Sequence, residues 1–191
     1  MTDLLDFIQN EISLNNEEKD FVKSVFKPLI VNKKNQILKQ KLVADKLFFI
    51  QKGLVRVYHI SEEGNEMTSE IMTAPSFVTC FESFRKRTPS TVIVETVTDC
   101  ELQMVLEKDY LKLFEKVQNW QTFCTSVYDN YLFRNSKRLN ALKNLSAKER
   151  YLDFVESNKQ IVNNIPIKHL ASYLGIKPQS LSRIRAEVFS N

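Results

Sequence analysis

The sequence predicts an α+β protein in which a β-rich region is followed only by helices, and two changes in its pattern carry this prediction. Short runs rich in β-branched and aromatic residues, separated by turn-forming residues, fill positions 36–106, as is typical of a sandwich or barrel. Helical spacing of apolar residues replaces them at positions 107–145, a stretch without Pro or Gly. Shorter helical patterns then follow at positions 146–187.

The individual elements follow from local signals. Residues 3–27 are predicted to form two helices, the second capped by Asn15 or Asn16 and closed by Pro28. A hairpin loop is expected at residues 61–65. The predicted strands are Gln36–Lys39, Lys46–Gln51, Leu54–Ile60, Met67–Thr73, Thr91–Val97 and Glu101–Leu106. The predicted helices after them are Glu107–Lys116 and about Asn119–Leu142, and a further helix opens with a capping box, Ser146 to Glu149.

Composition excludes several classes of protein. No stretch approaches the roughly 20 apolar residues that span a membrane, and residues 1–10 lack the Lys or Arg of a secretory signal, so a cytoplasmic location is expected. The wide spacing of Cys80, Cys100 and Cys124 indicates reduced, partly buried thiols rather than a disulfide framework or zinc site. Because His59 and His169 are the only histidines, we expect no metal site and no cupin-type enzyme.

Positive charge is concentrated toward the C-terminus. Residues 134–191 hold 11 Lys and Arg against 4 Asp and Glu, a net charge of +7. The preceding 133 residues hold 16 basic and 19 acidic side chains, a net charge of −3. This asymmetry favours a polyanionic partner for the C-terminal region, although a lysine-rich face is often only solvated.

Residues 165–187 carry the strongest functional signal, two short helices that meet at Gly175. Gly175 can adopt the left-handed conformation that ends a helix within one residue, and Pro178 suits the first turn of the next helix. Small Ala171 permits close approach of the two helices, while Leu181 and Ile184 are expected to face inward. The pattern predicts a helix-turn-helix, with a plain helical hairpin as the alternative.

The outward positions of the second helix carry amide, hydroxyl and guanidinium groups, which form hydrogen bonds with base edges and phosphates. Gln179 and Ser180 lie at the helix N-terminus, the end that enters the major groove in this motif. Arg183, one turn later, is placed to reach guanine O6 and N7. The predicted DNA-binding residues are Lys177, Gln179, Ser180, Ser182, Arg183 and Arg185.

The long helix presents a face of Trp120, Cys124, Val127 and Tyr131, spaced 4, 3 and 4 residues apart. This spacing fits two interpretations equally, a helix packed on its own β-domain or a seam shared by two copies of the chain. Because DNA-binding helices of this kind work in pairs, the predicted helix-turn-helix favours the seam, and we expect a homodimer.

At this point the sequence resembles the Crp/Fnr family of regulators, named for the cyclic-AMP receptor protein and the fumarate-nitrate regulator, in its short Bacteroidetes type. Residues 47–58, Leu-Phe-Phe-Ile-Gln-Lys-Gly-Leu-Val-Arg-Val-Tyr, resemble the family's signature strand-turn-strand. Residues 146–151 are similar to the helix after its hinge, and residues 170–176 with 180–185 are similar to its helix-turn-helix. The similarity covers nearly the whole chain.

The resemblance implies a cyclic-nucleotide-binding-like jelly roll, a long dimerisation helix and a helix-turn-helix domain, here with little or no wing because the sequence stops six residues after Arg185. It also implies a pocket for a small effector, which we expect at Arg56, Phe77, Ser90 and Thr91. The arginine that binds a cyclic phosphate in the family is replaced by a proline at position 89, so a cyclic-AMP response is not expected.

The predicted organisation is an effector-sensing domain over 1–116, a dimerisation helix over 117–145 and a DNA-binding domain over 146–191. The expected partners are double-stranded DNA, a second copy of the chain, RNA polymerase and a small effector of unknown identity, with no cofactor and no membrane. The predicted function is sequence-specific transcription regulation. A ligand-binding module that signals through protein contacts is the alternative.

Overall fold

The computed structural model describes residues 3–189, and it confirms the α+β class and the jelly-roll sandwich. Two antiparallel sheets of 4 strands each pack face to face, in the orders β1-β8-β3-β6 and β2-β7-β4-β5. The strands are β1 (Lys27–Val31), β2 (Gln36–Leu38), β3 (Lys46–Lys52), β4 (Leu54–Ile60), β5 (Glu66–Thr73), β6 (Ser76–Val78), β7 (Ile93–Thr96) and β8 (Cys100–Leu106).

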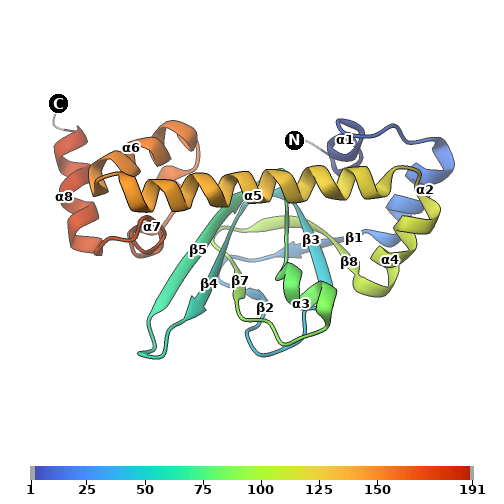
Figure 1. The fold of residues 1–191 in the computed structure, drawn as a ribbon, viewed down its shortest axis with the longest axis horizontal. Helices are drawn as coiled ribbons and strands as arrows, with labels where there is room; N and C mark the ends of the chain where they lie inside the picture. The colour runs from blue at the N-terminus through green and yellow to red at the C-terminus, as the bar shows by residue number, and fades with distance from the viewer. Residues whose placement is uncertain (1–2, 190–191) are drawn as a thin grey trace.

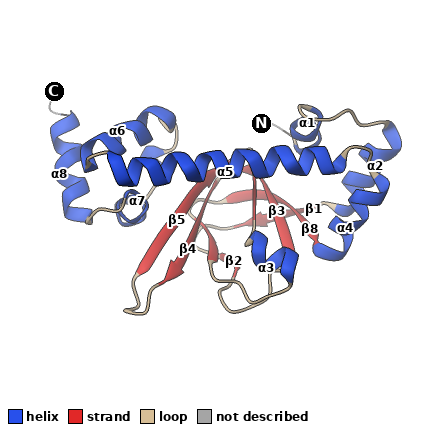
Figure 2. Cartoon of the chain, in the orientation of Figure 1, coloured by secondary structure: helices blue, strands red, loops and turns tan. Residues whose placement is uncertain are grey.

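Apart from α3, which lies beside the sheets, the shorter helices gather at the two ends of the molecule, and one long helix connects them (Figures 1 and 2). The N-terminal helices and α4 lie at one end, whereas α6, α7 and α8 lie at the other, beside β5. The helices are α1 (Leu4–Gln9), α2 (Asn16–Val25), α3 (Phe81–Lys86), α4 (Glu107–Lys116), α5 (Trp120–Asn144), α6 (Ala147–Ser157), α7 (Ile167–Leu174) and α8 (Pro178–Phe189), with a short 3-10 turn at Val162–Asn164.

Most predicted elements are confirmed, and the missed ones have physical reasons. The capping boxes of α2, at Asn15 and Glu18, and of α6 both form. Pro28, expected only to end a helix, instead lies in β1, which is an edge strand where a missing backbone N–H costs no ladder bond. Strand β6 was not predicted because its 3 residues are too few to show the alternation of apolar and polar side chains that marks a strand. Little or no wing was predicted after the helix-turn-helix. The described residues end with α8 and contain no strand after it, and residues 190–191 lie outside the described residues.

An aromatic cluster forms the centre of the sandwich core and anchors the start of α5. The ring of Phe77 lies 5.1 Å from Phe49, 5.8 Å from Phe123 of α5 and 5.9 Å from Phe7 of α1, measured between centroids. These tilted and edge-on arrangements are the favourable geometries for aromatic pairs. The N-terminal helix and the first turns of α5 are therefore part of the β-domain core.

This packing corrects the predicted dimer seam. Trp120 and Cys124 are only 2% and 5% exposed, and both belong to the core of their own β-domain. Val127 packs against that core, and the ring of Tyr131 lies 5.7 Å from that of Phe81 in α3. These four side chains face the sandwich because their apolar stripe is satisfied within the chain, which was the other interpretation of their spacing.

Candidate nucleic-acid interface

The helix-turn-helix is built as the sequence predicts. Gly175 adopts the left-handed conformation (φ 67°, ψ 37°), and its N–H donates to the carbonyls of Ala171 and Ser172, which ends α7. Leu170, Ala171 and Leu181 are fully buried between α7 and α8. A Cβ added to Gly175 would lie 3.1 Å from Cδ2 of Leu142, so the turn also packs closely on the end of α5.

The outer face of α8 is solvent-exposed. Lys177, Gln179, Ser180, Ser182 and Arg183 are all exposed, and Figure 1 shows α8 at the far end of the molecule, away from the sheets. The Ser182 hydroxyl donates to the carbonyl of Pro178, 3.0 Å away, so its single O–H donor is already used within the helix.

Arg185 departs from the predicted outer face. It is only partly exposed, and its guanidinium donates to the side-chain oxygen of Asn163 over 3.4 Å. The single carboxylate on α8, Glu187, pairs with Lys148 of α6 at 3.3 Å. Gln179 and Arg183, which lie one turn apart, are the remaining long polar side chains of α8. Neither has a hydrogen-bond or ion-pair partner among the contacts described for residues 3–189.

The first helix of the motif, α7, docks on strand β5 of its own β-domain. The Ser172 hydroxyl accepts from the N–H of Thr68 at 2.8 Å and donates to the carbonyl of Glu66 at 3.1 Å. Arg138 of α5 joins the same contact, because its guanidinium donates to the carbonyls of Thr68 and Tyr173. Hydrogen bonds to backbone groups thus hold the helix-turn-helix on the β-domain, while the outer face of α8 stays exposed.

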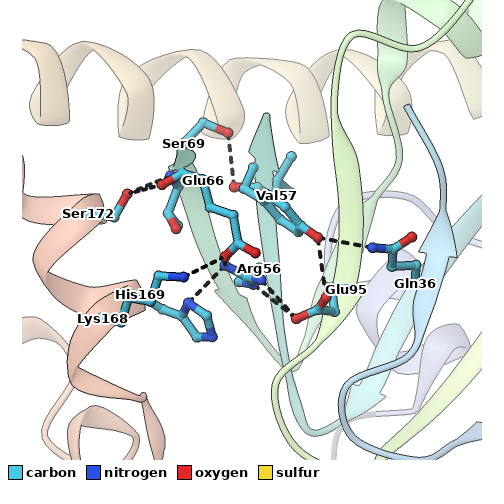
Figure 3. A network of polar contacts seen from close by, with 11 residues as sticks. Gln36, Arg56, Val57, Glu66, Ser69, Glu95, Lys168, His169 and Ser172 are labelled. Carbon is cyan, nitrogen blue, oxygen red and sulfur yellow. Dashed lines mark hydrogen bonds and ion pairs between the residues drawn. The ribbon is translucent and has the colours of Figure 1, made fainter. Parts of the chain in front are cut away.

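A buried charge network completes this interface (Figure 3). Arg56 of β4 is 2% exposed and forms ion pairs with Glu66 at 2.8 Å and Glu95 at 3.0 Å. Its Nη1 also lies 2.8 Å from Nδ1 of His169 in α7, and Lys168 lies 3.8 Å from Glu66. The prediction that Arg56 lines an effector pocket is therefore corrected, since its donors join the two domains.

The network shifts the pKa values of His169 and Glu66. Burial lowers the pKa of His169, and the positive charge of Arg56 lowers it further. A neutral His169 presents the lone pair of Nδ1 to the Arg56 guanidinium. Burial alone would raise the pKa of Glu66, but the hydrogen bond and charge of Arg56 outweigh it and lower that pKa below its usual value.

The other predicted pocket residues do not meet in a cavity. Phe77 belongs to the aromatic core described above, Ser90 is buried and donates to the carbonyl of Val92, and Thr91 is exposed. The space between the sandwich and α5, which Phe77 lines, measures only about 20 Å³. Small-molecule sites span about 300–1,000 Å³, so the space beside Phe77 is too small for an effector in this conformation.

The three cysteines are buried, and none of them forms a disulfide in the part of the chain that the structure describes. Within residues 3–189, no cluster of His, Cys, Asp and Glu has an arrangement able to hold a metal ion. In the same part of the chain, no helix is both long and apolar enough to cross a bilayer.

Sequence reasoning missed the interface between α7 and the sheets. Its signal was present as a charged Arg56 inside the otherwise apolar run of β4 and as His169 in α7, two residues that the sequence places 113 positions apart. An arginine in a buried strand demands carboxylate partners, yet no local pattern shows which partners they are.

Comparisons with known proteins agree with this architecture. Residues 30–117 match the family model of the cyclic nucleotide-binding domain. A search among curated proteins finds no match to this sequence. The resemblance to Crp/Fnr regulators extends over about nine-tenths of the chain at the level of the fold, and those proteins are transcription regulators rather than enzymes.

Three solved structures illustrate the likeness. The c-di-GMP responsive global regulator CLP of Xanthomonas campestris is 14% identical with a TM-score of 0.72, and 92% of each chain is covered. FixK2 of Bradyrhizobium japonicum is also 14% identical, with a TM-score of 0.72 over 87% of this chain and 85% of its own. A regulator of the Crp/Fnr family from Eubacterium rectale is 17% identical, with a TM-score of 0.71 over 90% and 82%.

Proposed function

We propose that this chain is a sequence-specific, DNA-binding transcription regulator of the Crp/Fnr type, and that α8 is its recognition helix. The observation that carries the proposal is the free outer face of α8, where Gln179, Ser180 and Arg183 are exposed beside a helix N-terminus. Amide and guanidinium groups in this position are suited to bidentate contacts with adenine and guanine in the major groove.

A homodimer is part of this proposal, with a seam different from the one that the sequence suggested. Beyond the β-domain, α5 exposes Leu132, Phe133 and Leu139, which are 58%, 70% and 55% accessible. Apolar side chains so exposed on a soluble helix favour a partner surface. Exposed residues on this side of α5 follow an alternating spacing of 3 and 4, at Thr122, Thr125, Asp129, Leu132, Ser136 and Leu139.

The remaining partners follow from this function. A regulator of this type acts in the cytoplasm, where RNA polymerase and the chromosome are its targets. In this proposal residues 1–116 form the effector-sensing domain, 117–145 the dimerisation helix and 146–191 the DNA-binding domain. A small effector bound to the first domain would move α5 and the DNA-binding domain together.

Selection of bound sequences from random duplexes tests the proposal. The expected result is enrichment of a near-palindromic site whose half-sites lie one helical turn apart, about 34 Å. Affinity for that site should fall steeply with salt, because phosphate contacts release counterions. Absence of enrichment, together with salt-insensitive binding to another protein, would favour the alternative of a module that signals through protein contacts.

A further inference from the structure

A cavity of about 420 Å³ lies where α5, α6, α7 and the turn between β5 and β6 meet. Its lining includes apolar side chains, among them Ile71, Pro75 and Phe154, and a set of charged side chains, which we call the charged wall. Its volume falls within the range of about 300–1,000 Å³ typical of small-molecule sites. The aromatic-lined space between the sandwich and α5 offers only about 20 Å³ by comparison.

The charged wall is strongly positive. Arg134, Lys137, Arg138 and Arg150 line the cavity, and Asp153 is the one carboxylate among its lining residues. Asp153 pairs with Lys137 at 3.0 Å. In the part of the chain that the structure describes, no carboxylate forms an ion pair with the three guanidinium groups, and the one carboxylate of the lining, Asp153, pairs with Lys137.

The existing contacts of these arginines leave donors available. Arg150 donates Nε to the carbonyl of Leu174 and Nη1 to that of Leu145, which orients its guanidinium rigidly. Arg138 uses only Nη2 for its carbonyl contacts, and its buried Nε has no hydrogen-bond partner. A buried donor without a partner is unfavourable, which marks Arg138 as a side chain whose hydrogen bonding is incomplete within the described residues.

Glu70 is the acidic group that could neutralise this wall, but it lies outside the lining residues. It interacts with Arg134 and Arg138 through space, yet its carboxyl is hydrogen-bonded to Tyr131, and burial raises its pKa. Because Glu70 lies outside the lining, the lining residues themselves carry four positive charges against the one negative charge of Asp153.

We propose that this cavity is a binding site for a compact organic phosphate or pyrophosphate, held by Arg134, Arg138 and Arg150. Guanidinium groups match phosphate oxygens in a bidentate fork, and several of them together favour an anion of more than one charge. Because the cavity is bounded by α5, the β5–β6 turn and the helices that carry α8, its occupant would fix the DNA-binding domain on the β-domain. This regulatory consequence rests on the proposed function, whereas the binding itself does not.

Isothermal titration of the full chain with sodium pyrophosphate, at constant ionic strength, tests the site. Arg134→Gln is the informative variant, because Arg134 is exposed and has no hydrogen bond within the described residues whose loss would unfold the chain. Its matched control is Arg85→Gln, which removes the same charge from an exposed position on α3, outside the cavity. Asp153→Asn removes the negative charge from the lining.

The parent chain should bind pyrophosphate saturably, and Arg134→Gln should weaken binding about tenfold, the loss of one charge-assisted contact. Asp153→Asn should strengthen binding, a gain that a folding defect does not produce, and Arg85→Gln should match the parent. Absence of saturable binding, or equal affinities for all four proteins, would overturn the proposal. If the chain binds DNA but no pyrophosphate, the proposed pyrophosphate site is wrong and the proposed function stands. If it binds pyrophosphate through Arg134 but no DNA, the proposed function is wrong and the site stands.

Discussion

Replacing Gly175 by alanine should destabilise the helix-turn-helix by about 2 kcal/mol, and the contributions follow from the turn itself. A left-handed conformation costs a residue with a Cβ about 1–2 kcal/mol. The new methyl would lie 3.1 Å from Leu142, whose side chain must leave its rotamer at a further cost of about 0.5–1.5 kcal/mol. The reduced freedom of the unfolded chain offsets about 0.4–1 kcal/mol of this sum.

Gly64→Ala is the matched control. Gly64 also has a positive φ, 80°, but nothing lies within 4 Å of the position of its Cβ. Its substitution should therefore cost about 1 kcal/mol, the backbone strain less the entropy gain. Chemical denaturation followed by circular dichroism compares the two variants. Equal losses of stability would refute the close contact between Gly175 and Leu142, whereas adding Leu142→Ala should remove the excess cost if the contact exists.

Three further predictions concern the interfaces of the chain. Acidification from about pH 7.5 to about pH 5.5 should loosen the docking of α7, because the pKa of His169 lies below its ordinary 6.5 and the undocked chain binds the proton more readily. The measurement is the protection factor of the β5 amides, which compares each exchange rate with its intrinsic rate at the same pH. It should fall on acidification in the parent chain and stay unchanged in His169→Gln. Phe133→Glu should convert the dimer to monomers in sedimentation, whereas the equally drastic Leu111→Glu on α4 should not; a dimeric Phe133→Glu contradicts the seam. Arg56→Met should cost about 3–5 kcal/mol in thermal unfolding because it strands buried carboxylates, while Lys52→Met, which breaks an exposed pair, should cost far less; similar losses would mean that the network is not buried in solution.

Local signals made the helix-turn-helix predictable. Gly175, Pro178 and the capping box at Ser146 act within a few residues, so their consequences can be read from neighbouring positions. The strand β4 was likewise predicted with its observed bounds, since β-branched and aromatic residues make up most of its run.

Long-range contacts could not be predicted. Helical spacing places Trp120 and Cys124 on one face but does not say whether that face meets the sandwich or another chain, and burial in the structure decides for the sandwich. The same holds for Arg56, whose partners come from β5, β7 and α7. The cavity at the domain junction depends on four elements that only the fold brings together.

The affinity of Arg183→Ala for the selected duplex tests the central claim most directly. Removing a bidentate guanidinium contact should cost about 1–3 kcal/mol, roughly a 5- to 150-fold loss, and should relax specificity at one base pair. Arg85→Ala, which removes an exposed arginine outside the helix-turn-helix, should bind like the parent. If Arg183→Ala binds the duplex as tightly and as selectively as Arg85→Ala, α8 is not the element that reads DNA.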